Sequence, residues 1–125
     1  MHAAKEDLPA SIVVPGVVAS RHAQWGDLNV AVERIDIGDA TDFFAGRLPG
    51  GRCDCPHWGY VLEGRMRIKY ADHDEVISAG DLFYLPPGHI PVVEQTVELI
   101  EFSPLDAYER TTAALLSSET SATNH

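Results

Sequence analysis

The feature that most restricts how this chain can fold is a run of short β-forming segments between residues 29 and 103. These segments are rich in Val, Ile, Leu and aromatic residues, and they end at Gly, Pro or Asp residues that favour turns. Many short strands separated by such turns are typical of an all-β sandwich or barrel. The strands that we predict span residues 29–37, 41–45, 53–62, 65–70, 75–78, 82–85, 91–94 and 97–103, with tight turns at Glu63-Gly64 and Gln95-Thr96.

The two ends of the chain follow other patterns. An apolar segment at 12–18 is broken by Pro15-Gly16, which predicts a short strand with a turn, laid against the body. After Ser103-Pro104, apolar residues recur at helical spacing, with Ser103 as the expected N-cap. We therefore divide the chain into an N-terminal arm at 1–28, a β-barrel at 29–103, a short C-terminal helix at 104–116 and a disordered tail at 117–125.

Length and charge limit the partners of this chain. Its 125 residues suffice for one domain with a hydrophobic core. The formal net charge of −10 argues against nucleic acid or an anionic membrane surface as a partner, because both require a basic face. No apolar run reaches the length of a membrane span, and the acidic N-terminal residues do not resemble a signal peptide, so we expect a cytoplasmic protein.

Both cysteines of the chain lie in one predicted strand. Cys53, Cys55 and His57 alternate along it, so their side chains are expected to share a face. Residues two apart on a strand have Cα atoms roughly 6.5–7 Å apart, farther than an ordinary disulfide allows. We therefore expect two reduced thiols, as is usual in the cytoplasm.

Thiolate and imidazole groups on one face suggest a metal site. They are the ligands that zinc prefers, usually in a four-coordinate tetrahedral arrangement. We predict a zinc site at Cys53, Cys55 and His57, with His89 as the fourth ligand. The alternative is two small buried cysteines and a histidine that donates to a backbone carbonyl, because the usual Cys-x₂-Cys zinc spacing is missing.

Two motifs resemble those of the cupin superfamily. The segment Tyr60-Val61-Leu62-Glu63-Gly64 is similar to the end of the first cupin motif. The segment 80–89 is similar to the second motif, with Gly80, five residues, Pro86-Pro87-Gly88 and then His89. The resemblance covers about residues 29–103 and implies a double-stranded β-helix, that is, a jelly-roll barrel, here followed by the short C-terminal helix.

The usual cupin metal ligands are not all present. The resemblance implies a His-x-His pair, then Glu, then a His after the Pro-x-Gly. Counted back from Gly64, these first three positions hold Gly51, Cys53 and His57, and the last His position holds Pro91. The metal set that we predict is therefore a rebuilt one, and no carboxylate stands among its candidates, which disfavours a 2-His-1-carboxylate iron site.

Two functions remain open. One is an enzyme that acts on a small metabolite in the barrel, with three protein ligands and an open position on the metal. The other is a non-catalytic module that binds a small ligand, with a closed structural Cys₂His₂ site or no metal. The cupin resemblance implies isomerases, dioxygenases, lyases or ligand-binding modules, and a fold alone does not choose among them.

We also expect a homodimer. Trp58, Tyr60 and Leu62 point away from the predicted ligands and would form an outward apolar patch, which usually marks an interface. The segment 12–18 or the C-terminal helix could cover the same patch within one chain. The cupin resemblance implies pairing through one sheet, as a two-fold dimer would require.

Overall fold

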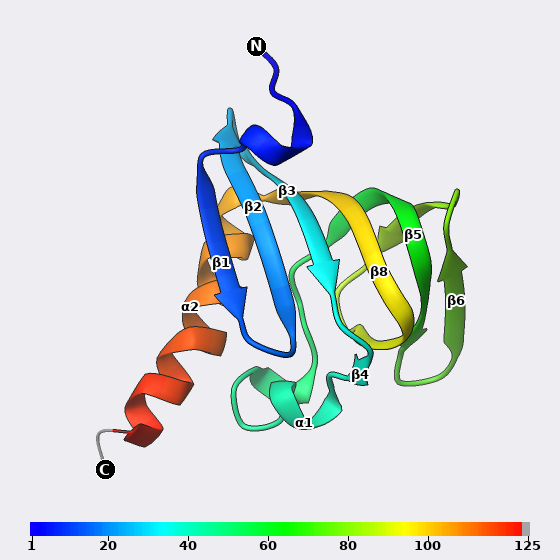
Figure 1. The fold of residues 1–125 in the computed structure, drawn as a ribbon. Helices are drawn as coiled ribbons and strands as arrows, with labels where there is room; N and C mark the ends of the chain where they lie inside the picture. The colour runs from blue at the N-terminus through cyan, green and yellow to red at the C-terminus, as the bar shows by residue number, and fades with distance from the viewer. Residues whose placement is uncertain (124–125) are drawn as a thin grey trace.

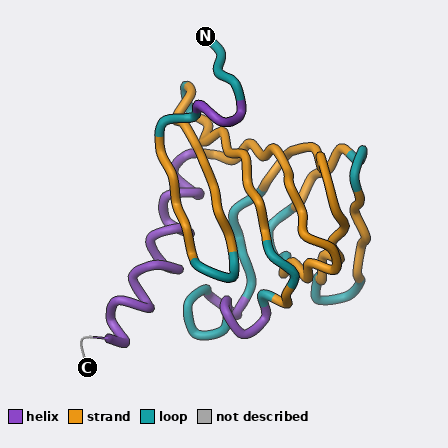
Figure 2. The backbone as a smooth tube through the Cα atoms, in the orientation of Figure 1, coloured by secondary structure: helices purple, strands orange, loops and turns teal. Residues whose placement is uncertain are grey.

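The computed structural model describes the backbone of residues 1–123 and the side chains of residues 1–116. Figures 1 and 2 show a curved β-sheet with one long helix beside its N-terminal strands. The strands are β1 Ala10–Val14, β2 Val18–Trp25, β3 Leu28–Ile35, β4 Gly38–Asp39, β5 His57–Lys69, β6 Asp74–Ser78, β7 Leu82–Leu85 and β8 Ile90–Pro104. The helices are α1 Thr41–Phe44 and α2 Leu105–Thr123, with short 3₁₀ turns at η1 Lys5–Asp7 and η2 Pro49–Gly51.

All strand pairs described are antiparallel and belong to one sheet with the order β1-β2-β3-β8-β5-β6. The short strands β4 and β7 pair with β8 and β5, respectively. Strands β5 and β8 thus form the centre of the fold, and their neighbours change from one half of each strand to the other (Figure 1). The predicted all-β jelly roll with a C-terminal helix is confirmed.

Strands β5 and β8 bend together at one point. Gly64 has φ +86°, and a Cβ there would lie 2.1 Å from the Thr96 carbonyl oxygen. The β5–β8 register shifts between Val61 and Met66, opposite this contact. The tight turns predicted at Glu63-Gly64 and Gln95-Thr96 are therefore wrong: the residues form a shared bend that curves the sheet without ending either strand.

The strand predicted at 41–45 is wrong, because α1 occupies this place. Asp39 Oδ1 accepts a hydrogen bond from the Thr41 backbone N–H at 2.8 Å, which starts a turn. The Phe44 N–H then donates to the Ala40 carbonyl oxygen, and the Phe44 side chain is buried. Burial of this aromatic ring outweighs the β propensity of the segment.

The N-terminal residues form strands of the main sheet. Pro15 and Gly16 make the tight turn between β1 and β2, in which the Val17 N–H donates to the Val14 carbonyl oxygen. Strand β2 then pairs with β3 along its whole length. The segment 1–28, which we expected to be an arm, therefore contains strands β1 and β2 of the main sheet.

Helix α2 starts at Leu105, whose N–H donates to the Asp27 carbonyl oxygen, and it runs beyond the predicted end at 116. The segment that we expected to be a disordered tail, 117–125, overlaps the end of this helix. Its last two residues, 124 and 125, lie outside the described residues.

The core consists of two clusters. One lies between the halves of the sheet and contains Val61, Met66, Ile68, Ile77, Phe83, Leu85, Val93, Val97 and Leu99. The other lies at the barrel mouth and contains Phe44, Leu48, Cys53, Cys55, Ile90 and Ala107. In the part of the chain that the structure describes, no helix is long and apolar enough to cross a bilayer.

Candidate metal centre

Cys53 and His89 are brought together by backbone pairing. The Cys53 N–H donates to the His89 carbonyl oxygen at 3.0 Å, and the Gly88 N–H donates to the Cys53 carbonyl oxygen at 2.8 Å. Strand β5 begins only at His57, so the strand predicted at 53–62 is correct for residues 57–62 alone. The alternation that we used to group Cys53 with His57 does not hold through Pro56, yet the isolated bridge to His89 places both side chains inside the barrel.

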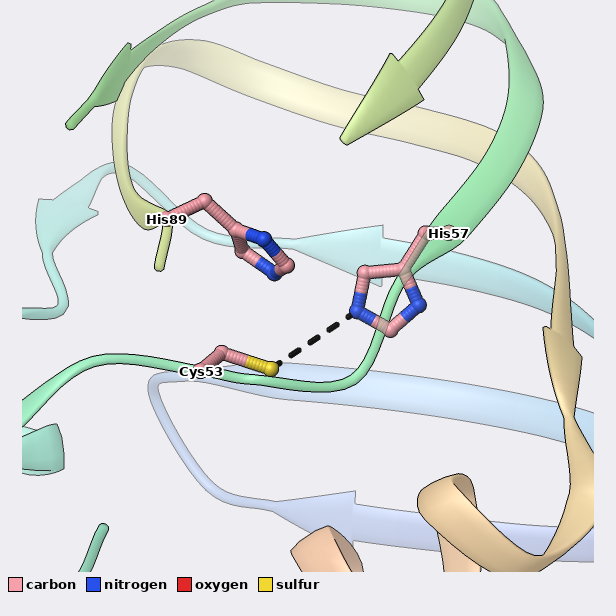
Figure 3. Close-up of side chains that lie close together, drawn as sticks. All are labelled: Cys53, His57 and His89. Carbon is pink, nitrogen blue, oxygen red and sulfur yellow. Dashed lines mark hydrogen bonds between the residues drawn. The ribbon is translucent and has the colours of Figure 1, made fainter. Parts of the chain in front are cut away.

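Three metal-ligating side chains converge at this place. One ligand atom each of Cys53, His57 and His89 lies within 4.8 Å of the other two (Figure 3). The Cys53 Sγ is 3.8 Å from His57 Nε2, and the two imidazole ring centroids are 5.0 Å apart. Cys53 and His89 are buried, and the His57 side chain is 13% exposed.

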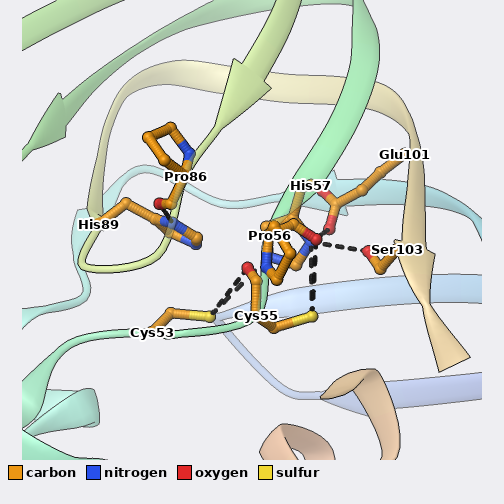
Figure 4. A network of polar contacts seen from close by, with 8 residues as sticks. All are labelled: Cys53, Cys55, Pro56, His57, Pro86, His89, Glu101 and Ser103. Carbon is orange, nitrogen blue, oxygen red and sulfur yellow. Dashed lines mark hydrogen bonds and ion pairs between the residues drawn. The ribbon is translucent and has the colours of Figure 1, made fainter. Parts of the chain in front are cut away.

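Hydrogen bonds at the far side of each imidazole fix its orientation. His89 Nδ1 is 2.8 Å from the Pro86 carbonyl oxygen, which can only accept, so Nδ1 carries the proton and Nε2 has a free lone pair. His57 Nδ1 lies 2.7 Å from Ser103 Oγ and 2.8 Å from Glu101 Oε1 (Figure 4). Partners of this kind hold the Nδ1–H tautomer of metal-binding histidines and leave Nε2 for the metal.

Burial keeps both imidazoles in the form that binds metal. Loss of solvation lowers the pKa of His57 to about 4 and that of His89 to about 4, so both rings are neutral at neutral pH. Burial also raises the pKa of the Cys53 thiol to about 12. Cys53 is therefore a thiol in the metal-free protein, and a metal ion would displace its proton on binding.

Cys55 lies outside this group of three. Its side chain is fully buried, but its Sγ is 4.0 Å from His57 Nδ1, the nitrogen that faces away from Cys53. The Cys55 Sγ–H donates to the Pro56 carbonyl oxygen at 3.6 Å. Of the four residues predicted from sequence, the structure brings Cys53, His57 and His89 together and places Cys55 behind His57 (Figure 4).

Two carboxyl groups adjoin the centre, and neither was predicted from the sequence: Glu101 is buried and Glu33 is half-buried. Glu33 of β3 and Glu101 of β8 hydrogen-bond each other through their side chains. Burial raises the pKa of Glu101 to about 7 and that of Glu33 well above its ordinary value. The signal was present in the alternation of β8, where Glu101 shares the inward face with Val97 and Leu99.

The centre opens into a cavity of about 200 Å³ at the barrel mouth. Its polar end contains Cys53, His57, His89, Glu33 and Glu101. Its other walls are mainly apolar and come from β1, β2 and the turn between them, α1 and α2, with Ile12, Val14, Val17, Phe43, Phe44 and Leu115 among them.

No family model and no curated protein sequence match the chain, whereas solved structures do. It is similar to an RmlC-like cupin from Shewanella frigidimarina NCIMB 400, at 18% identity and a TM-score of 0.58, over 82% of this chain and 87% of that chain. A cupin-2 domain containing protein from the same organism aligns at 19% identity and a TM-score of 0.50, over 68% and 78%. An oxalate decarboxylase variant from B. subtilis aligns at 17% identity and a TM-score of 0.55, over 80% of this chain but 28% of that chain.

This chain has a cupin fold. The resemblance seen in the motifs at 60–64 and 80–89 is thus confirmed at the level of the fold. At the cupin ligand positions, Gly51 lies in η2 and Pro91 lines the cavity, and neither can supply a side-chain ligand. Within the cupin barrel, the donor set is one thiol and two neutral imidazoles, which suits zinc better than a metal that prefers oxygen ligands.

Proposed function

We propose that this cupin barrel binds one zinc ion through Cys53 Sγ, His57 Nε2 and His89 Nε2. The observation that carries the proposal is that one ligand atom of each of these three residues lies within 4.8 Å of the other two, in a largely buried place. The hydrogen bonds that Nδ1 of His57 and His89 make support it, because they leave both Nε2 atoms facing Cys53 or the space beside it.

We further propose that the protein is an enzyme that acts on a small molecule in the barrel. Three protein ligands with an open fourth position are the arrangement of catalytic zinc sites, whereas structural sites are closed. When bound, zinc would supply a Lewis acid or a bound hydroxide to a substrate in the cavity. Glu101 and Ser103 would hold the His57 ring in place, and the apolar walls would exclude water.

A non-catalytic module with a closed site is the second candidate, and Cys55 decides between the two. Cys55 is the second of the two cysteines in the chain. A closed Cys₂His₂ site would need its sulfur to move to the Cys53 side of His57. The position of Cys55 behind the ring favours the open site. A requirement for Cys55 in metal binding would favour the closed one.

Cobalt(II) substitution tests the proposed metal site and distinguishes the open site from the closed one. We expect the cobalt protein to show the intense visible bands of a four-coordinate site together with a thiolate charge-transfer band. The charge-transfer band should vanish in Cys53→Ser and persist in Cys55→Ser. Loss of the band in Cys55→Ser, or weak octahedral bands in the wild type, would contradict an open site with one thiolate.

We also propose that the protein is a homodimer that pairs through the outer face of β5, β7 and β8. Cross-strand neighbours place large side chains together on this face: Trp58, Tyr60, Leu82, Tyr84 and Phe102. Trp58 stacks on Tyr84 and is still 45% exposed. The two segments that could have covered the patch line the inner cavity instead, with Ile12 and Val14 of β1 and Leu115 of α2.

The cytoplasmic location stays a prediction.

A further inference from the structure

The walls of the cavity change from polar to apolar away from the candidate metal ligands, and this change limits which molecules can fill it. The inference drawn from it rests on the proposed function and names the substrate class of the same site. Cys53, His57 and His89 lie at one end, with the hydrogen-bonded pair of Glu33 and Glu101 beside His57. Beyond this end, the walls come from β1, β2, α1 and α2.

Strand β1 and helix α2 each turn one face to the cavity. On β1, Ile12 and Val14 line the cavity and alternate with Val13, which is 65% exposed. On α2, Tyr108 and Leu115 lie two helical turns apart and line the same cavity. Figures 1 and 2 show α2 beside the N-terminal strands. A molecule in the cavity therefore meets hydrocarbon from both elements.

These walls offer no partner to a charged group. Among the residues whose side chains are described, no Lys, Arg, Asp, Asn or Gln lines this cavity, and its two glutamates belong to the metal end. On α2 the polar wall groups are hydroxyls, and Tyr108 and Thr112 hydrogen-bond each other. A charged group on the ligand away from the metal would lose its hydration without gaining a partner. A sugar, or a molecule charged at both ends, therefore fits this cavity poorly.

The volume of the cavity limits the length of the ligand. An apolar cavity of about 150 Å³ holds benzene. By the same ratio, the cavity of about 200 Å³ has room for roughly eight non-hydrogen atoms. This corresponds to a short chain or a single ring.

We propose that the substrate has a short, uncharged hydrocarbon body and a single polar group that binds the metal. The polar group takes the open position beside Cys53, His57 and His89. The body lies between β1 and α2. The polar group is any neutral or anionic zinc ligand, so the uncharged body defines the substrate class.

A series of alkyl hydroxamic acids tests the body, because each member carries the same metal-binding group. Acetohydroxamic, propanohydroxamic, butanohydroxamic and pentanohydroxamic acid differ by one CH₂ each. Calorimetric titration of the zinc-loaded full chain measures their affinities, and zinc content is checked afterwards. We expect affinity to rise at least about twofold with each CH₂, which is half of the transfer free energy of a methylene. Constant or falling affinity along the series would overturn the apolar body site.

A probe of equal length tests the charge. The hydroxamic acid of γ-aminobutyrate has an ammonium group where pentanohydroxamic acid has its terminal methyl. We expect it to bind at least about tenfold more weakly, because the ammonium meets hydrocarbon walls. Equal affinity of the two probes would refute an uncharged body.

Two adjacent residues of β1 test where the body lies. Ile12→Asp should weaken pentanohydroxamic acid at least about tenfold, because it puts a charge on the cavity wall. Val13→Asp adds the same charge on the outer face and should leave the affinity within about twofold. Leu115→Trp, which fills the cavity from α2, should abolish binding and serves as the second variant. Unchanged affinity in Ile12→Asp or Leu115→Trp, with wild-type zinc content and circular dichroism, would overturn the location.

The failure of this proposal differs from the failure of the proposed function. Toluene tests the apolar walls in metal-free protein, through NMR shift changes of the cavity methyl groups. If zinc does not bind but toluene does, and Leu115→Trp abolishes toluene binding, the proposed function fails and the apolar body site stands. If zinc binds but neither toluene nor a longer hydroxamic acid gains affinity from the walls, the substrate class fails and the metal site stands.

Discussion

Gly59 of β5 leaves no room for a side chain. A Cβ at this position would lie 2.1 Å from the Ile100 carbonyl oxygen and 2.5 Å from the Phe83 ring. Because one of these neighbours is backbone of the central strand β8, the sheet itself would have to move. We expect Gly59→Ala to lower the free energy of unfolding in urea by at least about 2 kcal/mol. Gly38→Ala, at a position with nothing within 4 Å, should change it by less than about 1 kcal/mol, and equal effects would show that the close approach is not limiting.

The carboxyl pair makes stability depend on pH. Burial raises the pKa of Glu101 to about 7 from an unfolded value of 4.5, so the folded state holds its proton over this range. A raised carboxyl pKa stabilises the fold fully below the unfolded value, and this stabilisation is lost as pH rises through the folded value. We therefore expect Glu101→Gln to gain stability over the wild type as pH rises from about 4.5 to about 7, by roughly 3 kcal/mol.

Urea unfolding of metal-free protein at several pH values measures this difference. His57 and His89, whose pKa values are lowered by burial, contribute with the opposite sign, and comparison with the wild type removes the part that is common to both proteins. Glu109→Gln serves as the exposed control. A difference between Glu101→Gln and wild type that does not vary with pH would contradict a raised pKa of the buried Glu101 carboxyl.

The candidate site was partly predictable at the level of single residues. Thiol and imidazole groups are common metal ligands, so Cys53, His57 and His89 could be proposed as ligands from the sequence. Glu33 and Glu101 look like ordinary acidic residues in an acidic chain. Only the register of β3 and β8 shows that their side chains point into the barrel. Which ring nitrogen Cys55 faces depends on the path of the chain through Pro56, and spacing along the sequence does not contain that information.

At the scale of elements, the start of α1 depends on one carboxylate. Asp39 accepts from the Thr41 N–H and also pairs with Lys69 of β5, which ties α1 to the central strand. We expect Asp39→Ala to lower the free energy of unfolding by about 1 kcal/mol, and Asp39→Asn by clearly less, because Asn keeps the acceptor. Thermal unfolding of the two variants checks this, and equal losses would assign the effect to the Lys69 pair.

The two turns that were wrongly predicted from the sequence share one physical cause. Turn residues at 63–64 and 95–96 predicted chain reversals, but a glycine with positive φ also allows a bend inside a long strand. The local pattern is the same in both cases. Only the pairing of β5 with β8 on both sides of the bend distinguishes them, and this pairing joins residues far apart in the sequence.

At the scale of the whole molecule, we predict that the exposed face of β5, β7 and β8 with Trp58, Tyr84 and Leu82 sets the oligomeric state. We expect sedimentation of the wild type at micromolar concentration to give a dimer, because several large apolar side chains exposed side by side on one face are unusual on a monomer. Leu82→Lys combined with Tyr84→Lys should give a monomer with unchanged zinc content. Val76→Lys, at an exposed position of β6 outside the patch, should stay dimeric. A monomeric wild type, or a dimer that survives the double substitution, would refute pairing through this face.

Zinc stoichiometry and affinity in a matched set of variants test the central claim most directly. The wild type, Cys55→Ser and His73→Ala, which changes an exposed histidine, should each bind one zinc per chain in elemental analysis and chelator competition. Cys53→Ser and His89→Ala should each lose more than about a hundredfold in zinc affinity, since loss of a ligand exceeds the usual effect of losing its supporting partner. Full zinc occupancy and unchanged affinity in Cys53→Ser and His89→Ala would contradict a metal centre built from Cys53, His57 and His89.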